Sequence, residues 1–182
     1  MSTFADRPNS AVLVVDFQVG TVVDTYRRDE VQAKLKELVA KARAAGVPVI
    51  WVQDVAEGRE PGSEAWQIVP DLGPLPEEPR VQKRYGDAFE ETDLSELLAA
   101  GRIGRLYVAG AQSDACVRST IHGAFTRGYD TILVGDAHTT EDLSAWGNPA
   151  PEQVIAHTNL YWAYHEGPGR VAQVVNTGDL QL

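Results

Sequence analysis

The sequence predicts an α/β fold, a three-layer, doubly wound sheet of six mostly parallel strands in the order 3-2-1-4-5-6. Short apolar runs rich in β-branched residues alternate with segments of helical periodicity, a pattern typical of βαβ units with right-handed crossovers. Several runs are apolar throughout, as in strands buried on both faces of a parallel sheet. At 182 residues, the chain is predicted to form a single domain, 1–182.

Each predicted element has a local signal. The apolar run 11–15 indicates a strand, and 28–45 indicates a helix because its apolar side chains share one side and Gly46 follows it. Glycines and prolines break residues 54–80 into a long loop, which in a compact domain tends to be functional. The other expected strands are 47–52, 81–83, 106–109, 129–134 and 171–175; the other helices are 92–98, one starting at Cys116, and 151–164; a second loop is 138–149.

Composition limits the classes of partner. The net charge is −10, from 16 basic and 26 acidic residues with no basic cluster, so we expect no nucleic-acid partner. The apolar runs fall short of the roughly 20 residues that a membrane helix needs, and the N-terminus lacks the features of a secretory signal. A single cysteine excludes an intramolecular disulfide. These features fit a cytoplasmic protein with no membrane partner.

The only cysteine, Cys116, follows the expected strand 106–109 and starts an expected helix, with Ser113 and Asp114 as candidate N-cap residues. Free N–H groups and the helix dipole stabilise an anion at such a position, which favours a nucleophilic thiolate. The alternative is that Cys116 is a small buried hydrophobic residue.

An acidic residue is expected close to this cysteine. Asp16 ends the first strand, and Cys116 follows the fourth. In the predicted strand order these two strands are neighbours at the point where the order reverses, which is where ligands bind in such sheets. The sequence therefore predicts an acid and a thiol in one crevice.

Three motifs together are far rarer than any one of them. They are Asp-Phe-Gln at 16–18, Lys-Arg-Tyr-Gly-Asp-Ala-Phe at 83–89, and Ala-Gly-Ala-Gln-Ser-Asp-Ala-Cys-Val-Arg-Ser-Thr at 109–120. With Gly128-Tyr129 and Asp136-Ala137, they make the chain resemble the isochorismatase-like cysteine hydrolase family, which includes nicotinamidases and N-carbamoylsarcosine amidohydrolase. The resemblance runs from about residue 10 to the C-terminus.

The resemblance implies a catalytic triad of Asp16, Lys83 and Cys116. It also implies a cis peptide between Ala111 and Gln112, and an oxyanion hole formed by the backbone N–H groups of Gln112 and Cys116. The chain would then hydrolyse an amide, ureide or lactam C–N bond of a small molecule through a thioester at Cys116, and would form a homo-oligomer. A lysine beside the thiol is expected to lower its pKa.

No metal or other cofactor is expected. Nicotinamidases place an aspartate followed closely by histidines after the second strand. Here Asp54 occupies that position, and no histidine occurs before His122. The four histidines show no pair at a ligand spacing, so helix packing or solvent exposure is the expected role of each.

Several side chains near the motifs or in the two long loops are candidates for a substrate pocket, with core or loop packing as the alternative for each. Gln18 is as well suited to orienting Asp16 as to touching substrate. The candidates are Phe17, Gln18, Tyr26, Trp66, Tyr85 and Trp146.

Three other functions are alternatives to this one. A non-catalytic ligand-binding or scaffold domain of the same fold would not need the three side chains together, and rapid alkylation of Cys116 near neutral pH would argue against it. A vinyl-ether hydrolase is less favoured because that branch of the family typically lacks the cysteine. A dinucleotide-binding oxidoreductase is disfavoured because only one glycine follows the first strand where its fingerprint needs three.

Overall fold

A computed structural model describes residues 2–182 and contains a six-stranded sheet in the order β3-β2-β1-β4-β5-β8. All neighbouring strands in it are parallel. The predicted fold class and strand order are therefore confirmed, with β8 as the sixth strand. The strands are β1 (Asn9–Val15), β2 (Val49–Asp54), β3 (Arg80–Lys83), β4 (Ile103–Ala111), β5 (Asp130–Thr139) and β8 (Gln173–Val175).

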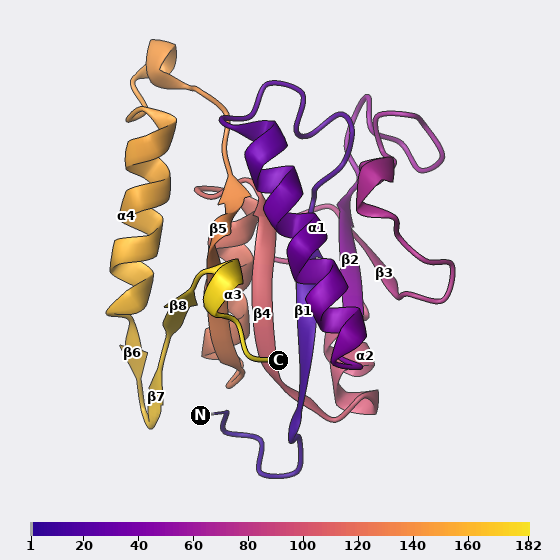
Figure 1. Cartoon of the computed structure of the whole chain (residues 1–182), viewed down its shortest axis with the longest axis vertical. Helices are drawn as coiled ribbons and strands as arrows, with labels where there is room; N and C mark the ends of the chain where they lie inside the picture. The colour runs from indigo at the N-terminus through magenta and orange to yellow at the C-terminus, as the bar shows by residue number, and fades with distance from the viewer. Residues whose placement is uncertain (1) are drawn as a thin grey trace.

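Helices cover both faces of the sheet (Figure 1). Helix α1 (Arg28–Ala44) packs on one face, and α2 (Leu94–Ala100) and α3 (Cys116–Thr126) pack on the other. Helix α4 (Pro151–Ala163) contacts β5 and β8. Short 3₁₀ helices span Pro70–Leu72, Ser144–Trp146 and Thr177–Asp179. Within residues 2–182, no helix is long and apolar enough to cross a bilayer.

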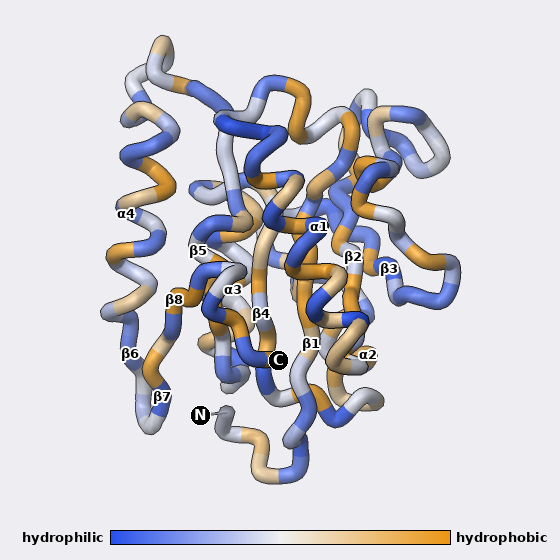
Figure 2. Tube along the Cα trace, viewed as in Figure 1, coloured by the Kyte–Doolittle hydropathy of each residue, from blue (hydrophilic) through white to orange (hydrophobic). Residues whose placement is uncertain are grey.

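The central strands are apolar on both sides because both sides are covered. Val12 and Val14 of β1 belong to the cluster that includes α1, whereas Leu13 and Val15 belong to the cluster that includes α2 and α3. Successive side chains of a strand point to opposite faces, so a strand between two helix layers needs an unbroken apolar run. Figure 2 shows these runs as the apolar centre of the sheet.

The chain after α4 differs from the single strand expected at 171–175. A turn at Pro168-Gly169, with Gly169 at φ 69°, folds β7 (Arg170–Val171) back onto β6 (Glu166–Gly167) as an antiparallel hairpin. Proline at the first central position and a glycine with positive φ at the second suit a type II turn. Only residues 173–175 then join the sheet beside β5.

Strand β4 lies between β1 and β5 and is fitted closely to both. Gly110 has φ 118°, and a Cβ on it would lie 2.0 Å from the carbonyl oxygen of Val15, so only glycine fits there. On the other side the register shifts, with Val108 opposite Leu133 but Gly110 opposite His138. The additional residues of β5 bring His138 level with the carboxyl end of β4.

The long loop between β2 and β3 is attached to the segment that follows β1. The amides of Val19 and Gly20 donate to the carbonyls of Gln67 and Ala65 at 2.8 Å, and the Val69 amide donates to the Phe17 carbonyl at 3.0 Å. This part of the loop therefore forms a bonded wall beside the carboxyl edge of the sheet.

Candidate active site

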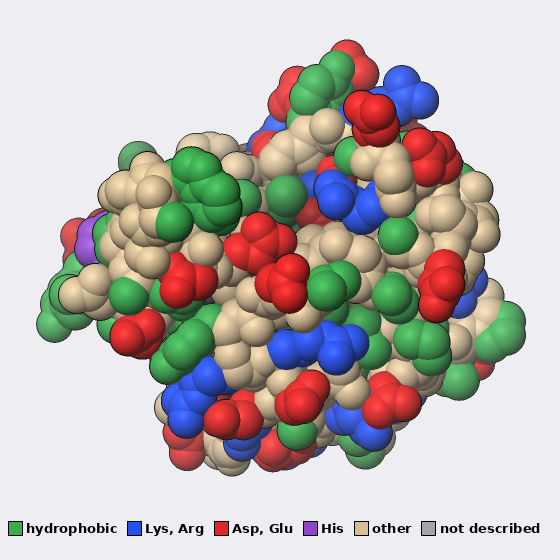
Figure 3. Space-filling view, turned by 90° about the horizontal axis from the view of Figure 1, so that it is seen from above, with side chains coloured by type: hydrophobic (Ala, Val, Ile, Leu, Met, Phe, Trp, Pro, Cys, Tyr) green, Lys and Arg blue, Asp and Glu red, His purple; other side chains and the backbone are tan. Residues whose placement is uncertain are grey.

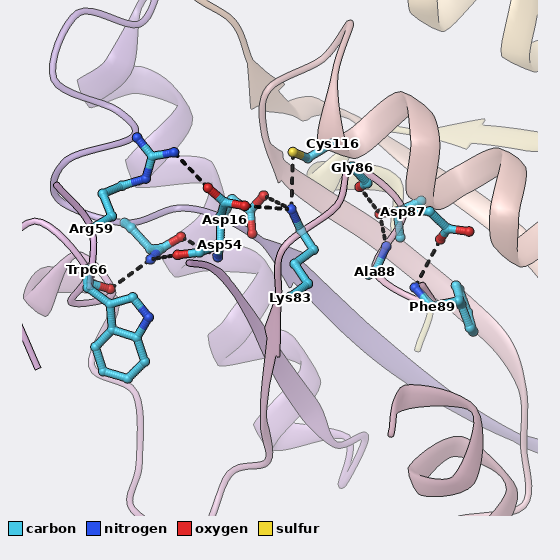
Figure 4. A network of polar contacts seen from close by, with 12 residues as sticks. Asp16, Asp54, Arg59, Trp66, Lys83, Gly86, Asp87, Ala88, Phe89 and Cys116 are labelled. Carbon is cyan, nitrogen blue, oxygen red and sulfur yellow. Dashed lines mark hydrogen bonds and ion pairs between the residues drawn. The ribbon is translucent and has the colours of Figure 1, made fainter. Parts of the chain in front are cut away.

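The three predicted catalytic side chains meet at the carboxyl edge of the sheet (Figure 4). The Nζ atom of Lys83 lies 2.7 Å from Oδ2 of Asp16 and 3.2 Å from Sγ of Cys116. Asp16 and Lys83 are buried, and Cys116 is partly exposed. The ammonium therefore bridges a carboxylate and a sulfur, and only the sulfur end of the arrangement reaches the surface. Seen from above this edge, acidic and basic side chains are scattered among uncharged ones (Figure 3).

Each of the three residues sits at the end of a regular element. Asp16 follows β1 with φ 47°, and its amide donates to the Val52 carbonyl at 3.0 Å. Aspartate is among the residues that best tolerate this left-handed conformation. Lys83 is the last residue of β3, and Cys116 is the first residue of α3. The parallel sheet brings all three positions to one edge.

Burial is the largest influence on the pKa values of the three side chains. It raises the pKa of Cys116 to about 12, with a further contribution from the Asp16 carboxylate that outweighs the opposing effect of Lys83. Burial likewise raises the pKa of Asp16 from 3.8 to about 6 against the opposing charge of Lys83. Burial on its own would lower the pKa of Lys83. The nearby Asp16, Cys116 and Asp54 outweigh this effect, so the pKa of Lys83 lies above its ordinary value of 10.5.

Lys83 lowers the thiol pKa as expected, but burial and Asp16 outweigh it, so the predicted preference for a thiolate is wrong. At neutral pH the resting site holds a thiol, a carboxylate and an ammonium. Lys83 does favour the thiolate, but its charge is already paired with Asp16, and a partly buried sulfur loses the solvation that would stabilise a charge. Alkylation near neutral pH consequently discriminates less well between an enzyme and a binding domain than the sequence suggested.

A second carboxylate borders the site. Oδ1 of Asp54 lies 3.5 Å from Nζ of Lys83, and its Oδ2 is 2.7 Å from Nη2 of Arg59 (Figure 4). Asp54 occupies the position at which nicotinamidases have a metal ligand, and in the structure it lies beside two cations. Sequence reasoning missed the role of Arg59, because nothing in the spacing of a loop residue indicates such a pair.

The segment between β4 and α3 forms a tight turn. The peptide bond between Ala111 and Gln112 is cis. The amides of Ala115 and Val117 donate to the Gln112 carbonyl at 3.0 and 3.1 Å. Within residues 2–182, the N–H groups of Gln112 and Cys116 have no backbone acceptor, so both are available to a ligand.

The two expected N-cap residues have other partners. The N-cap position of α3 is Ala115, which makes no side-chain cap. Oγ of Ser113 lies 2.7 Å from Nδ1 of His138. Asp114 accepts hydrogen bonds from Thr140 at 2.6 Å and from Asn148 at 3.0 Å. The side chains that the sequence assigned to capping therefore attach the turn to the end of β5 and the loop after it.

The six candidate pocket residues have different surroundings. Phe17 packs in the core beside α1. The buried Gln18 amide donates to the carbonyls of Asp54 and Trp66 and accepts from the Asp54 amide. Tyr26 lines a cavity of about 400 Å³ between α1 and α4 whose lining includes none of the three catalytic candidates. Tyr85 and Trp146 are exposed, by 49 % and 81 %, and Trp66 is partly buried.

Comparisons with known proteins place the chain. Residues 10–148 match the isochorismatase domain. The chain is 35 % identical over 147 residues to a streptothricin hydrolase of Streptomyces noursei, covering 78 % of this chain and 58 % of that protein. It is 29 % identical over 170 residues to ureidoacrylate amidohydrolase RutB of Agrobacterium fabrum, covering 70 % and 75 % of the two chains.

Solved structures agree with this match. A crystal structure of an isochorismatase from Pseudomonas putida KT2440 superposes with a TM-score of 0.84 at 29 % identity, covering 97 % of this chain and 92 % of that one. The chain spans little more than half the length of the streptothricin hydrolase, and most of the length of the other two proteins. With its domain match, its relatives and its fold in agreement, the chain belongs to the isochorismatase family of hydrolases.

Proposed function

We propose that this chain hydrolyses a C–N bond of a small molecule, in an amide, ureide or lactam, through a thioester at Cys116. One observation carries the proposal, the contact of Lys83 with both Asp16 and Cys116 at 2.7 and 3.2 Å. A nucleophile, a base and a fixed charge are the parts that covalent catalysis requires. The names of two relatives, streptothricin hydrolase and ureidoacrylate amidohydrolase, support hydrolysis of a small molecule.

In the first half of the reaction, Asp16 takes the thiol proton as Sγ of Cys116 bonds to the carbonyl carbon. Because the thiol pKa is about 12 and that of Asp16 about 6, proton transfer is uphill at rest and accompanies the attack. The carbonyl π electrons move to oxygen, and the N–H groups of Gln112 and Cys116 are proposed to stabilise this oxyanion. When the carbonyl re-forms, the C–N bond breaks, and the departing nitrogen takes the proton from Asp16.

In the second half, water attacks the thioester while Asp16 takes one of its protons. The C–S bond then breaks, and that proton returns to the sulfur, which restores the thiol. Lys83 stays protonated throughout, beside both Asp16 and the sulfur, while the negative charge passes from Asp16 to the oxyanion and back. The products are the acid and ammonia or an amine.

The pH profile follows from the raised pKa of Asp16. Because Asp16 must be a carboxylate to act as the base, kcat/KM is expected to fall as pH drops below about 6, rather than near the ordinary aspartate pKa of 3.8. Lys83 is held above 10.5, so no alkaline loss is expected before about pH 10. A rate profile from pH 4 to 10 measures both limits. A half-maximum near pH 4, or near pH 8 as for a free thiol, would contradict the assignment of Asp16.

The experiment that tests the function is a screen of small amides, ureides and lactams for release of ammonia or amine. Wild-type protein and Cys116→Ala are assayed side by side. Turnover by the wild type alone supports the proposal. Equal turnover by the variant refutes the thioester, and binding without turnover across the screen favours a non-catalytic domain.

A further inference from the structure

His138 is the only histidine among residues 2–182 that is fully buried, and the mechanism above does not use it. It lies near the end of β5, where the register shift places it opposite Gly110. Its two ring nitrogens have different partners. Nδ1 is 2.7 Å from Oγ of Ser113, and Nε2 is 2.9 Å from Oδ1 of Asn159 on α4.

These partners determine the tautomer. The Asn159 amide nitrogen donates to the Gly135 carbonyl at 2.9 Å, which can only accept. Oδ1 of Asn159 therefore faces the ring and accepts from Nε2–H. Nδ1 is then unprotonated and accepts from the Ser113 hydroxyl. Burial lowers the pKa of His138, in agreement with a neutral ring.

The series of hydrogen bonds from Asn159 through His138 to Ser113 ends on the turn that is proposed to bind the oxyanion. Ser113 is buried, follows Gln112 directly, and donates its own amide to the Thr139 carbonyl at 2.9 Å. Its backbone and its side chain are thus both bonded to consecutive residues of β5. The two available N–H groups, on Gln112 and Cys116, lie on either side of this attachment.

We propose that His138 is a positioning residue, which holds Ser113 through its neutral Nδ1 and thereby sets the direction of the Gln112 and Cys116 N–H groups. The inference rests on the proposed function for its effect on rate. Asn159 contributes by fixing the proton on Nε2, so that only Nδ1 is free to accept. The geometry of an oxyanion site matters because a misplacement of about 1 Å can cost about 10²-fold in rate.

The test compares variants of this chain with a matched control. Ser113→Ala removes the hydroxyl, and His138→Phe removes the acceptor at similar volume. Thr131→Val is the control, because Thr131 is buried in the same strand and, within residues 2–182, its hydroxyl donates to the Tyr129 carbonyl alone. Ser113→Ala and His138→Phe are each expected to lower kcat by about tenfold with KM little changed, which is less than the 10²–10³ lost when an oxyanion donor is removed.

The double variant separates positioning from general destabilisation. If both residues act through one hydrogen bond, Ser113→Ala/His138→Phe loses no more kcat than the worse single variant. Thr131→Val is expected to lower the melting temperature and leave kcat within twofold. A fall in melting temperature without a fall in kcat for Ser113→Ala would overturn the proposal.

A second readout does not depend on turnover. In ¹H–¹⁵N spectra, the amide resonances of Gln112 and Cys116 are expected to shift in Ser113→Ala and to stay in place in Thr131→Val. Unmoved resonances in both variants reject the positioning role even if no substrate is found. Shifted resonances together with an inactive wild type support the positioning role and reject the proposed function.

Discussion

Replacing Cys116 with alanine is expected to abolish hydrolysis while leaving the protein folded. In the proposed mechanism the sulfur forms the only covalent bond between protein and substrate, and loss of a nucleophile commonly costs about 10⁴-fold or more in kcat. Asp16 and Lys83 remain paired at 2.7 Å without it, so the buried charges keep their partners. Release of ammonia or amine measures the rate, and thermal melting measures the fold.

Mass spectrometry supplies the direct check. Wild-type protein quenched during turnover is expected to gain the mass of the acyl group on the peptide that contains Cys116, and Cys116→Ala is expected to gain none. A Cys116→Ala preparation free of wild-type protein that retains a tenth of the activity would rule out the thioester.

The second large effect is expected for Lys83→Met, which should inactivate and also destabilise the protein. Its ammonium is the cation paired with Asp16, and it also neighbours Asp54. Removing one partner from a buried ion pair leaves an uncompensated charge and costs roughly 3–5 kcal/mol. Urea unfolding at pH 8 measures the loss.

The pH dependence of that loss has a definite sign. Lys83 lowers the pKa of Asp16 in the native protein, so without Lys83 this already raised pKa rises further. A carboxyl whose folded pKa is raised binds its proton more tightly in the folded state, and stability falls as pH rises through that pKa. The deficit of Lys83→Met is therefore expected to be larger at pH 8 than at pH 5.

A double variant gives the control. Asp16→Asn removes the charge and suits the left-handed φ of 47° at this position, because asparagine tolerates that conformation as well as aspartate does. Lys83→Met/Asp16→Asn should recover much of the stability that Lys83→Met loses and remain inactive. An additive loss in the double variant would show that the two side chains are not energetically coupled.

The sheet could be predicted because its signal is local. An unbroken apolar run such as 11–15 has few alternatives to a doubly covered strand, and Gly46 marks the end of α1 in the sequence itself. The contact between Asp16 and Lys83 has no such local signal, because strands β1 and β3 are separated by 64 residues that include a long loop. That contact came from a resemblance of motifs rather than from periodicity.

The features that could not be predicted depend on the surroundings of a residue in the folded protein. The pKa of Cys116 reflects burial and the nearby Asp16 charge, and neither can be seen in a helix-capping pattern. Ser113 has the residue type of an N-cap but bonds to His138, because the register shift of β5 brings that ring within reach and the N-cap position falls on Ala115. The hairpin at 166–171 was missed because its strands are only two residues long.

The backbone bonds between residues 17–20 and 65–69 bear on whether this part of the long loop moves when a ligand binds. Amides held in such a ladder open rarely, so Val19, Gly20 and Val69 are expected to exchange their hydrogens for deuterium slowly, at the same rate in free and ligand-bound protein. Slow exchange that a ligand does not change would mean that this segment is fixed before binding and does not close afterwards.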